Sequence, residues 1–275
     1  MAIIEAVRDI FSYSFLLRAL IVGTLVSLCA SLLGVSLVLK RYSMIGDGLS
    51  HVGFGALAIA SAFGLAPLWV AVPAVIIAAF LLLKINNAKV MGDAAIAIIS
   101  SSALAIGVLT VSLTGTNTDL ESYMFGSIMS ISDSDAFLSI ALAVILTVMY
   151  IIFYNRIFAV TFDETFARAT GTRAGLYNTV IAILTAVTIV LGMRMMGALL
   201  ISSLIIFPCI TAMRVCKSFK SVCICSALLS VTCFFTGLVA SYVLKAPTGA
   251  SIVAVNILAL VLFSIIGAIH RRTAK

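Results

Sequence analysis

Charged residues are scarce in this chain of 275 residues. Asp, Glu, Lys and Arg together make up 10% of it, whereas a soluble domain carries about 25%. Hydrophobic residues account for 63%, and the mean hydropathy is +1.27. So few charged side chains cannot cover the surface of a globule in water. The composition therefore excludes an ordinary soluble protein and indicates a polytopic membrane protein.

The motifs of common catalytic sites are also missing. The chain has only two histidines and no HExxH sequence, which excludes a zinc-protease helix of that kind. No Gly-x-Ser-Gly turn supplies a serine nucleophile. Residues 192–197 have the Gly-x4-Gly spacing of a phosphate loop, but Ala198 and Leu199 follow, where that loop requires Lys and Ser or Thr. The sequence thus predicts a protein that is not an enzyme, and ATP-driven work would need a separate ATPase subunit.

Neither the cysteines nor the excess of basic residues predicts a disulfide framework or a nucleic-acid site. Three of the six cysteines fall inside apolar runs and three near a basic loop, as expected of reduced and mostly buried side chains. Cys223 and Cys225 form a C-x-C pair, and the sequence leaves open whether it touches a metal. The net charge is +7. Because the basic residues lie mainly at the ends of apolar runs, we expect them at the lipid surface and not on nucleic acid.

Nine apolar runs reach or approach the length of about 20 residues that a helix needs to cross a bilayer. Only Pro67 and its neighbours separate the second run from the third. We therefore expect an all-α membrane bundle of eight or nine transmembrane helices, built as one domain over residues 1–275. The runs cover residues 15–39, 44–65, 67–83, 94–113, 135–154, 174–192, 195–213, 221–244 and 250–269.

Charge asymmetry predicts the orientation of the bundle. Residues 114–135 contain four acidic residues and no basic one, which indicates an external loop. The positive-inside rule places the basic segments in the cytoplasm. With nine spans the two sets alternate, and the C-terminus is then cytoplasmic. The basic segments contain Lys40 and Arg41; Lys84 and Lys89; Arg156, Arg168 and Arg173; Arg214, Lys217 and Lys220; and Arg271, Arg272 and Lys275.

Two ionisable residues fall inside the second apolar run. Asp47 and His51 are four residues apart, so on a helix they share one face. A carboxylate and an imidazole suit a divalent transition metal. Two ligands are too few for tight binding, but a symmetric dimer would bring together two of each. The alternative is a buried Asp–His hydrogen bond that only steadies a helix junction.

A second candidate site lies in the basic loop after residue 154. Thr161, with Glu164 three residues later, has the pattern of a capping box that opens a helix. Gly171 predicts the end of that helix. A short capped helix between two spans would be able to dock on another protein. An ordinary solvated loop helix is the alternative.

Three stretches resemble the integral membrane permeases of bacterial ABC transporters for zinc, manganese and iron, the ABC-3 family. Residues 40–51 resemble the G-D-x-x-S-H signature of that family. Residues 119–126, and a set of motifs between Asp163 and Ala250, are weaker singly but occur in the family's order. The similarity covers about residues 15–268. The chain departs from the commonest signature at Gly48 and at residues 52–55, a variant that leans toward zinc.

The resemblance implies the fold and the partners of an ABC importer permease. These are a homodimer of multi-pass subunits in the bacterial plasma membrane, two cytoplasmic ATPase subunits and an extracellular metal-binding lipoprotein. The cargo implied is a divalent metal ion, zinc first and manganese or iron next, with no permanently bound cofactor. Asp47 and His51 match positions tied to metal passage. The positions that match the loop contacting the ATPase are Asp163, Glu164, Ala167 and Gly171.

Two other transport functions compete with this interpretation. A permease for a metal chelate, such as a siderophore, would need a wider and uncharged pathway, and the Asp47–His51 pair argues against it. A proton-driven secondary metal transporter would hold more carboxylates inside the membrane than this chain does. An intramembrane enzyme is disfavoured by the missing motifs.

Overall fold

The computed structural model describes residues 8–9, 11–86, 92–115, 124, 126 and 133–273, and these residues form helices without any strand. The expected all-α class is confirmed. Most of the predicted external loop, residues 114–135, lies outside the described residues. The helices are α2 (Ser14–Leu39), α3 (Ser43–Ala62), α4 (Pro67–Asn86), α5 (Gly92–Thr114), α7 (Asp133–Ile152), α8 (Tyr154–Phe162), α9 (Glu164–Ala169), α10 (Ala174–Met196), α11 (Ala198–Met213), α12 (Phe219–Leu244) and α13 (Thr248–Thr273).

By length and apolarity alone, fewer described helices qualify as membrane spans than the nine apolar runs suggest. Within the described residues, six helices are long and apolar enough to cross a bilayer: α2, α4, α5, α10, α12 and α13. Helices α7 and α8 pass that test only together, as a pair bent by 68°. Helix α11 falls short in length, with 16 residues or about 24 Å. Helix α3 is long enough, but its polar residues lower its hydropathy. The count of eight or nine spans is therefore not confirmed, although α3 and α11 both pack inside the bundle.

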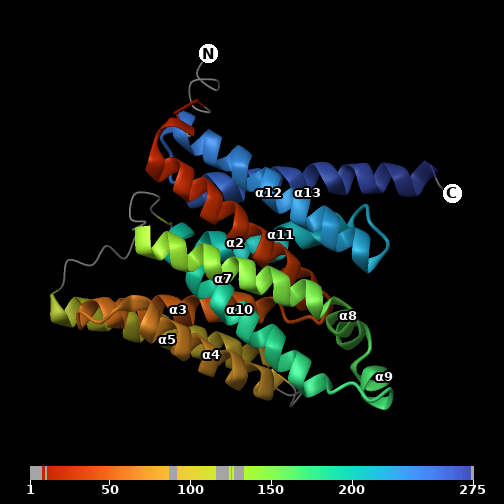
Figure 1. The fold of residues 1–275 in the computed structure, drawn as a ribbon, viewed down its shortest axis with the longest axis horizontal. Coiled ribbons are helices and arrows are strands. Elements are labelled where there is room, and N and C mark those ends of the chain that lie inside the picture. Colours follow the sequence, from red (N-terminus) through yellow and green to blue (C-terminus); the bar gives the residue numbers. More distant parts are fainter. Residues whose placement is uncertain are drawn as a thin grey trace.

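The bundle has two groups of helices with α10 between them (Figure 1). Helices α3, α4 and α5 pack together on one side, and α2, α11, α12 and α13 on the other. Helix α10 contacts both groups, and α3 also packs on α11. Helix α3 therefore lies at the junction of the two groups.

Close backbone contacts hold α3 in this position. A Cβ atom added to Gly55 would lie 2.3 Å from the carbonyl oxygen of Ala103 in α5. One added to Gly107 would lie 2.7 Å from the Cα atom of Gly55. No larger residue fits at either place without moving a helix, which is how small residues bring membrane helices together. Helix α3 is thus fixed against α5 along the segment that follows Asp47 and His51.

Candidate functional site

Asp47 and His51 lie one turn apart on α3, as the sequence predicts. The Nε2 atom of His51 is 3.8 Å from the Oδ2 atom of Asp47, and the two side chains are 32% and 44% exposed respectively. That distance is too long for a hydrogen bond. The pair is therefore neither buried nor closed on itself, in contrast to the structural alternative, and both side chains remain open to a ligand.

The neighbours of α3 explain why this strip stays open. Gly48 faces Ile96 and Ser100 of α5. On the other flank, the hydroxyl of Ser50 lies 3.0 Å from that of Ser202 in α11. At 100° per residue, Asp47 and His51 occupy the strip between these two flanks. The pair thus faces outward between α5 and α11, where no helix of the described chain covers it fully.

One chain supplies only two ligands at this place. No group of three or more His, Cys, Asp or Glu side chains able to hold a metal occurs among the described residues. The six cysteines are free. Cys223 is buried with its sulfur 3.8 Å from the Tyr150 hydroxyl, and residues two apart on a helix do not share a face. The C-x-C pair therefore does not form a second two-ligand site.

The second candidate site is helix α9, and its N-terminus differs from the prediction. Thr161 lies inside α8, which runs to Phe162. The cap is Asp163, whose side chain accepts a hydrogen bond of 2.9 Å from the backbone N–H of Phe166. The capping box at Thr161 is thus wrong, because packing of Ile157 and Val160 continues α8 past that residue. The expected stop is confirmed, since Gly171 follows α9 with φ +82°.

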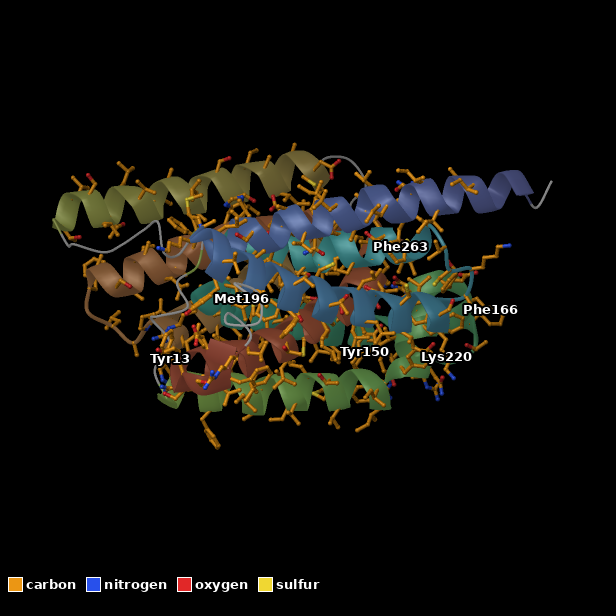
Figure 2. The ribbon with its side chains drawn as sticks, turned by 90° about the horizontal axis from the view of Figure 1, so that it is seen from above. Tyr13, Tyr150, Phe166, Met196, Lys220 and Phe263 are labelled. Carbon is orange, nitrogen blue, oxygen red and sulfur yellow. The ribbon has the colours of Figure 1, made fainter. Side chains whose placement is uncertain are left out.

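The four residues matched to the ATPase-contacting loop do not form a common exposed surface. Asp163 caps the helix, and Ala167 is fully buried against Val160 and Ala174. The large exposed apolar residue of α9 is Phe166, which is 66% exposed. Its side chain and Lys220 lie at the same end of the bundle, opposite Tyr13 (Figure 2). Phe166 is not among the four residues that the sequence argument matched to the ATPase-contacting loop.

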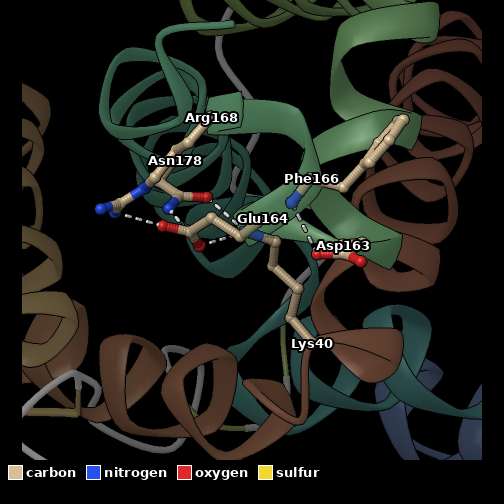
Figure 3. A network of polar contacts seen from close by, with 6 residues as sticks. All are labelled: Lys40, Asp163, Glu164, Phe166, Arg168 and Asn178. Carbon is tan, nitrogen blue, oxygen red and sulfur yellow. Dashed lines mark hydrogen bonds and ion pairs between the residues drawn. The ribbon is translucent and has the colours of Figure 1, made fainter. Parts of the chain in front are cut away.

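Glu164 points inward to a polar network that joins three helices (Figure 3). It accepts hydrogen bonds from the Asn178 amide of α10 at 3.0 Å and from the Arg168 guanidinium at 2.5 Å. Lys40, which caps the C-terminus of α2, is 7% exposed, and its ammonium lies 3.6 Å from the Glu164 carboxylate. The same ammonium donates to the side-chain oxygen of Asn178. Helices α2, α9 and α10 therefore meet at one carboxylate.

Opposite charges and hydrogen bonds counteract the effect of burial in this network. Burial lowers the pKa of Lys40, and the neighbouring Glu164 charge partly offsets that effect. Burial by itself raises the pKa of Glu164, but the hydrogen bonds from Asn178 and Arg168 and the charge of Lys40 outweigh it and leave the pKa below its usual value. Because the pKa of Glu164 is lowered in the folded chain, its stabilising contribution is present above the ordinary pKa of a glutamate and is lost as the pH falls through the lowered value.

Comparison with known proteins assigns the chain to a family. A model described as the ABC 3 transport family matches residues 12–267. The chain belongs to this family. It is 32% identical to the "Probable iron transport system membrane protein" of Haemophilus influenzae, over 93% of this chain and 91% of that protein. It is 28% identical to the "Manganese import system permease protein ScaB" of Streptococcus gordonii, over 90% of each chain.

A solved structure agrees with this assignment. The structure "PsaBC from Streptococcus pneumoniae in complex with Fab" superposes with a TM-score of 0.85 at 28% identity, covering 95% of both chains. The helical bundle described above is therefore the fold of this family over nearly its whole length.

Proposed function

We propose that this chain is the membrane permease subunit of an ABC importer for a divalent transition metal ion. The observation that carries the proposal is the Asp47–His51 pair, open on α3 in a member of a transport family. The relatives named above are manganese and iron systems, which favours those two ions as cargo. Zinc, which the variant signature favours, stays a prediction.

The pair suits a transported ion better than a stored one. A pathway must bind the ion well enough to replace part of its water and weakly enough to release it. Two ligands from each subunit meet this requirement, because one chain alone cannot enclose the metal. A second copy related by a two-fold axis would bring two Asp47 and two His51 side chains to the same place. No permanently bound cofactor is needed.

The partners and the orientation belong to the same proposal. A homodimer of this domain, residues 1–275, would join cytoplasmic ATPase subunits and an extracellular metal-binding lipoprotein in the bacterial plasma membrane. Helices α8 and α9, the turn between α11 and α12 and the far end of α13 lie at one end of the bundle (Figure 1). That end carries basic residues such as Arg168, Arg214 and Lys220, which supports a cytoplasmic location.

Metal uptake by the complete complex tests the function. The permease is reconstituted into liposomes with its ATPase and lipoprotein, and Mn²⁺, Fe²⁺ and Zn²⁺ are supplied in turn. We expect ATP-dependent uptake of Mn²⁺ or Fe²⁺ and none of an iron–siderophore complex. Uptake driven by a proton gradient without ATP would instead identify a secondary transporter.

Cysteine labelling tests the orientation. Single cysteines at Asn117 and Thr273 are introduced into a chain without native cysteines. In intact cells, a membrane-impermeant maleimide should label position 117, because the acidic loop is expected outside. Position 273 should react only after permeabilisation. Labelling of both positions from the same side contradicts the orientation.

A further inference from the structure

Helix α9 is held to the bundle at two places. Ala167 is its one buried residue, and it packs on Val160 and Ala174 close by in the chain. Glu164 supplies the contacts with more distant parts of the sequence, to Lys40 of the α2–α3 connection and Asn178 of α10. Helix α9 is therefore joined to α2 in two ways, through the packing of α8 and α10 and directly through the Glu164–Lys40 ion pair.

Lys40 is firmly joined to the start of α3. Only residues 40–42 separate α2 from α3. Within that turn, the backbone N–H of Tyr42 donates to the Leu37 carbonyl at 2.7 Å, and the N–H of Ile45 donates to the Tyr42 carbonyl at 3.0 Å. Arg41 adopts a left-handed conformation with φ +61°, which is uncommon for a residue other than glycine. The backbone of Lys40 is thus connected through a short hydrogen-bonded turn to the first turn of α3, and Asp47 lies on the next turn.

The environment of Lys40 makes its contact with Glu164 hard to break. The Lys40 side chain lines a narrow pocket whose walls are mostly apolar, with Leu37, Ile45, Leu49 and Ala182 among them. Only 7% of the side chain is exposed. Separation from Glu164 would leave a buried ammonium without its counter-charge, which is strongly unfavourable. Helix α9 and the α2–α3 turn are therefore expected to move together.

We propose that the contact of Lys40 with Glu164 and Asn178 is a positioning link, through which displacement of α9 moves the Asp47–His51 pair. The inference rests on the proposed function, in which an ATPase acts on α9. In this proposal Glu164, on the inner side of α9, transmits the movement of the helix. The exposed residues of α9 contact the ATPase. Lys40 is a positioning residue and does not touch the ion.

Hydrogen–deuterium exchange on the detergent-solubilised chain tests the link without any transport assay. In the variant Lys40→Met, backbone amides should exchange faster both in residues 163–171 and in residues 42–47. The matched control is Arg41→Met, which removes a neighbouring exposed cation from the same turn and should change neither segment. Faster exchange in α9 alone, or in neither segment, overturns the link. Glu164→Gln, which keeps the shape of the side chain, serves as a second variant should Lys40→Met fold poorly.

Transport by the complete complex then tests what the link does. With Mn²⁺ as the probe, Lys40→Met should retain basal ATP hydrolysis but lose at least tenfold in ions imported per ATP. Lys40→Met combined with Glu164→Gln should be no worse than either single variant, and Lys40→Arg should recover part of the loss. If Lys40→Met imports Mn²⁺ per ATP within twofold of Arg41→Met, the link is overturned, while the proposed function stands. If the parental complex shows no ATP-driven uptake while both exchange changes occur, the proposed function fails and the mechanical contact stands.

Discussion

Replacement of Asp47 by Asn should abolish metal uptake while the protein remains in the membrane at its normal level. The substitution keeps the shape of the side chain and removes the charge that is proposed to bind the ion. His51→Ala removes the nitrogen ligand and should have the same effect. Even outer-shell partners of metal ligands cost about 10- to 100-fold when they are removed, so the loss of a direct ligand should cost at least that much. Uptake of radioactive manganese by cells containing the whole importer measures it.

The exposed carboxylate of Asp93, in the first turn of α5, provides a matched control. Asp93→Asn removes the same charge from the same group of helices and should leave uptake unchanged. Acidification should also weaken uptake through the parental protein, because a protonated imidazole cannot bind a metal and binding releases protons. If Asp47→Asn and His51→Ala both import metal at the parental rate, the pair is structural and the proposed site is wrong.

Replacement of Phe166 by Asp should separate the permease from its ATPase without unfolding it. The ring is 66% exposed, so folding of the chain does not depend on it, and α9 keeps its contacts through Ala167 and Glu164. If Phe166 is one of the few residues that dominate the interface, its truncation should cost about 2 kcal/mol or more, or roughly a 30-fold loss of affinity. Recovery of the ATPase with a tagged permease measures this loss, and metal uptake should fall with it.

Phe63 offers a control of equal exposure at the far end of α3, where it is 64% exposed. Phe63→Asp should leave ATPase binding unchanged. Reversing the charges of Asp163 and Glu164 would be a less specific experiment, because it also removes the cap of α9 and the partner of Lys40. If Phe166→Asp binds the ATPase and imports metal normally, the exposed face of α9 is not the docking surface.

Composition and local spacing were enough to predict the class of the protein and the Asp47–His51 pair. With 10% charged residues, an all-helical membrane bundle is the solution that satisfies the backbone in lipid. Asp47 and His51 share a face because a helix repeats every 3.6 residues, and their side chains lie 3.8 Å apart as near neighbours on that face. Gly171 ends α9 for an equally local reason, since glycine takes up a positive φ readily.

The tertiary structure decided which of these residues are buried and which are exposed. The N-cap of α9 is Asp163 and not the predicted Thr161, because α8 continues through Thr161. Tertiary packing commonly overrides local helix propensity in this way. Burial of Lys40 turned Glu164 inward, a contact across 124 residues that no local pattern records. The close fit of Gly55 on α5 and of Ser50 on α11 left the Asp47 strip uncovered. Local spacing determines which residues share a helix face, but only contacts between distant segments determine what that face meets.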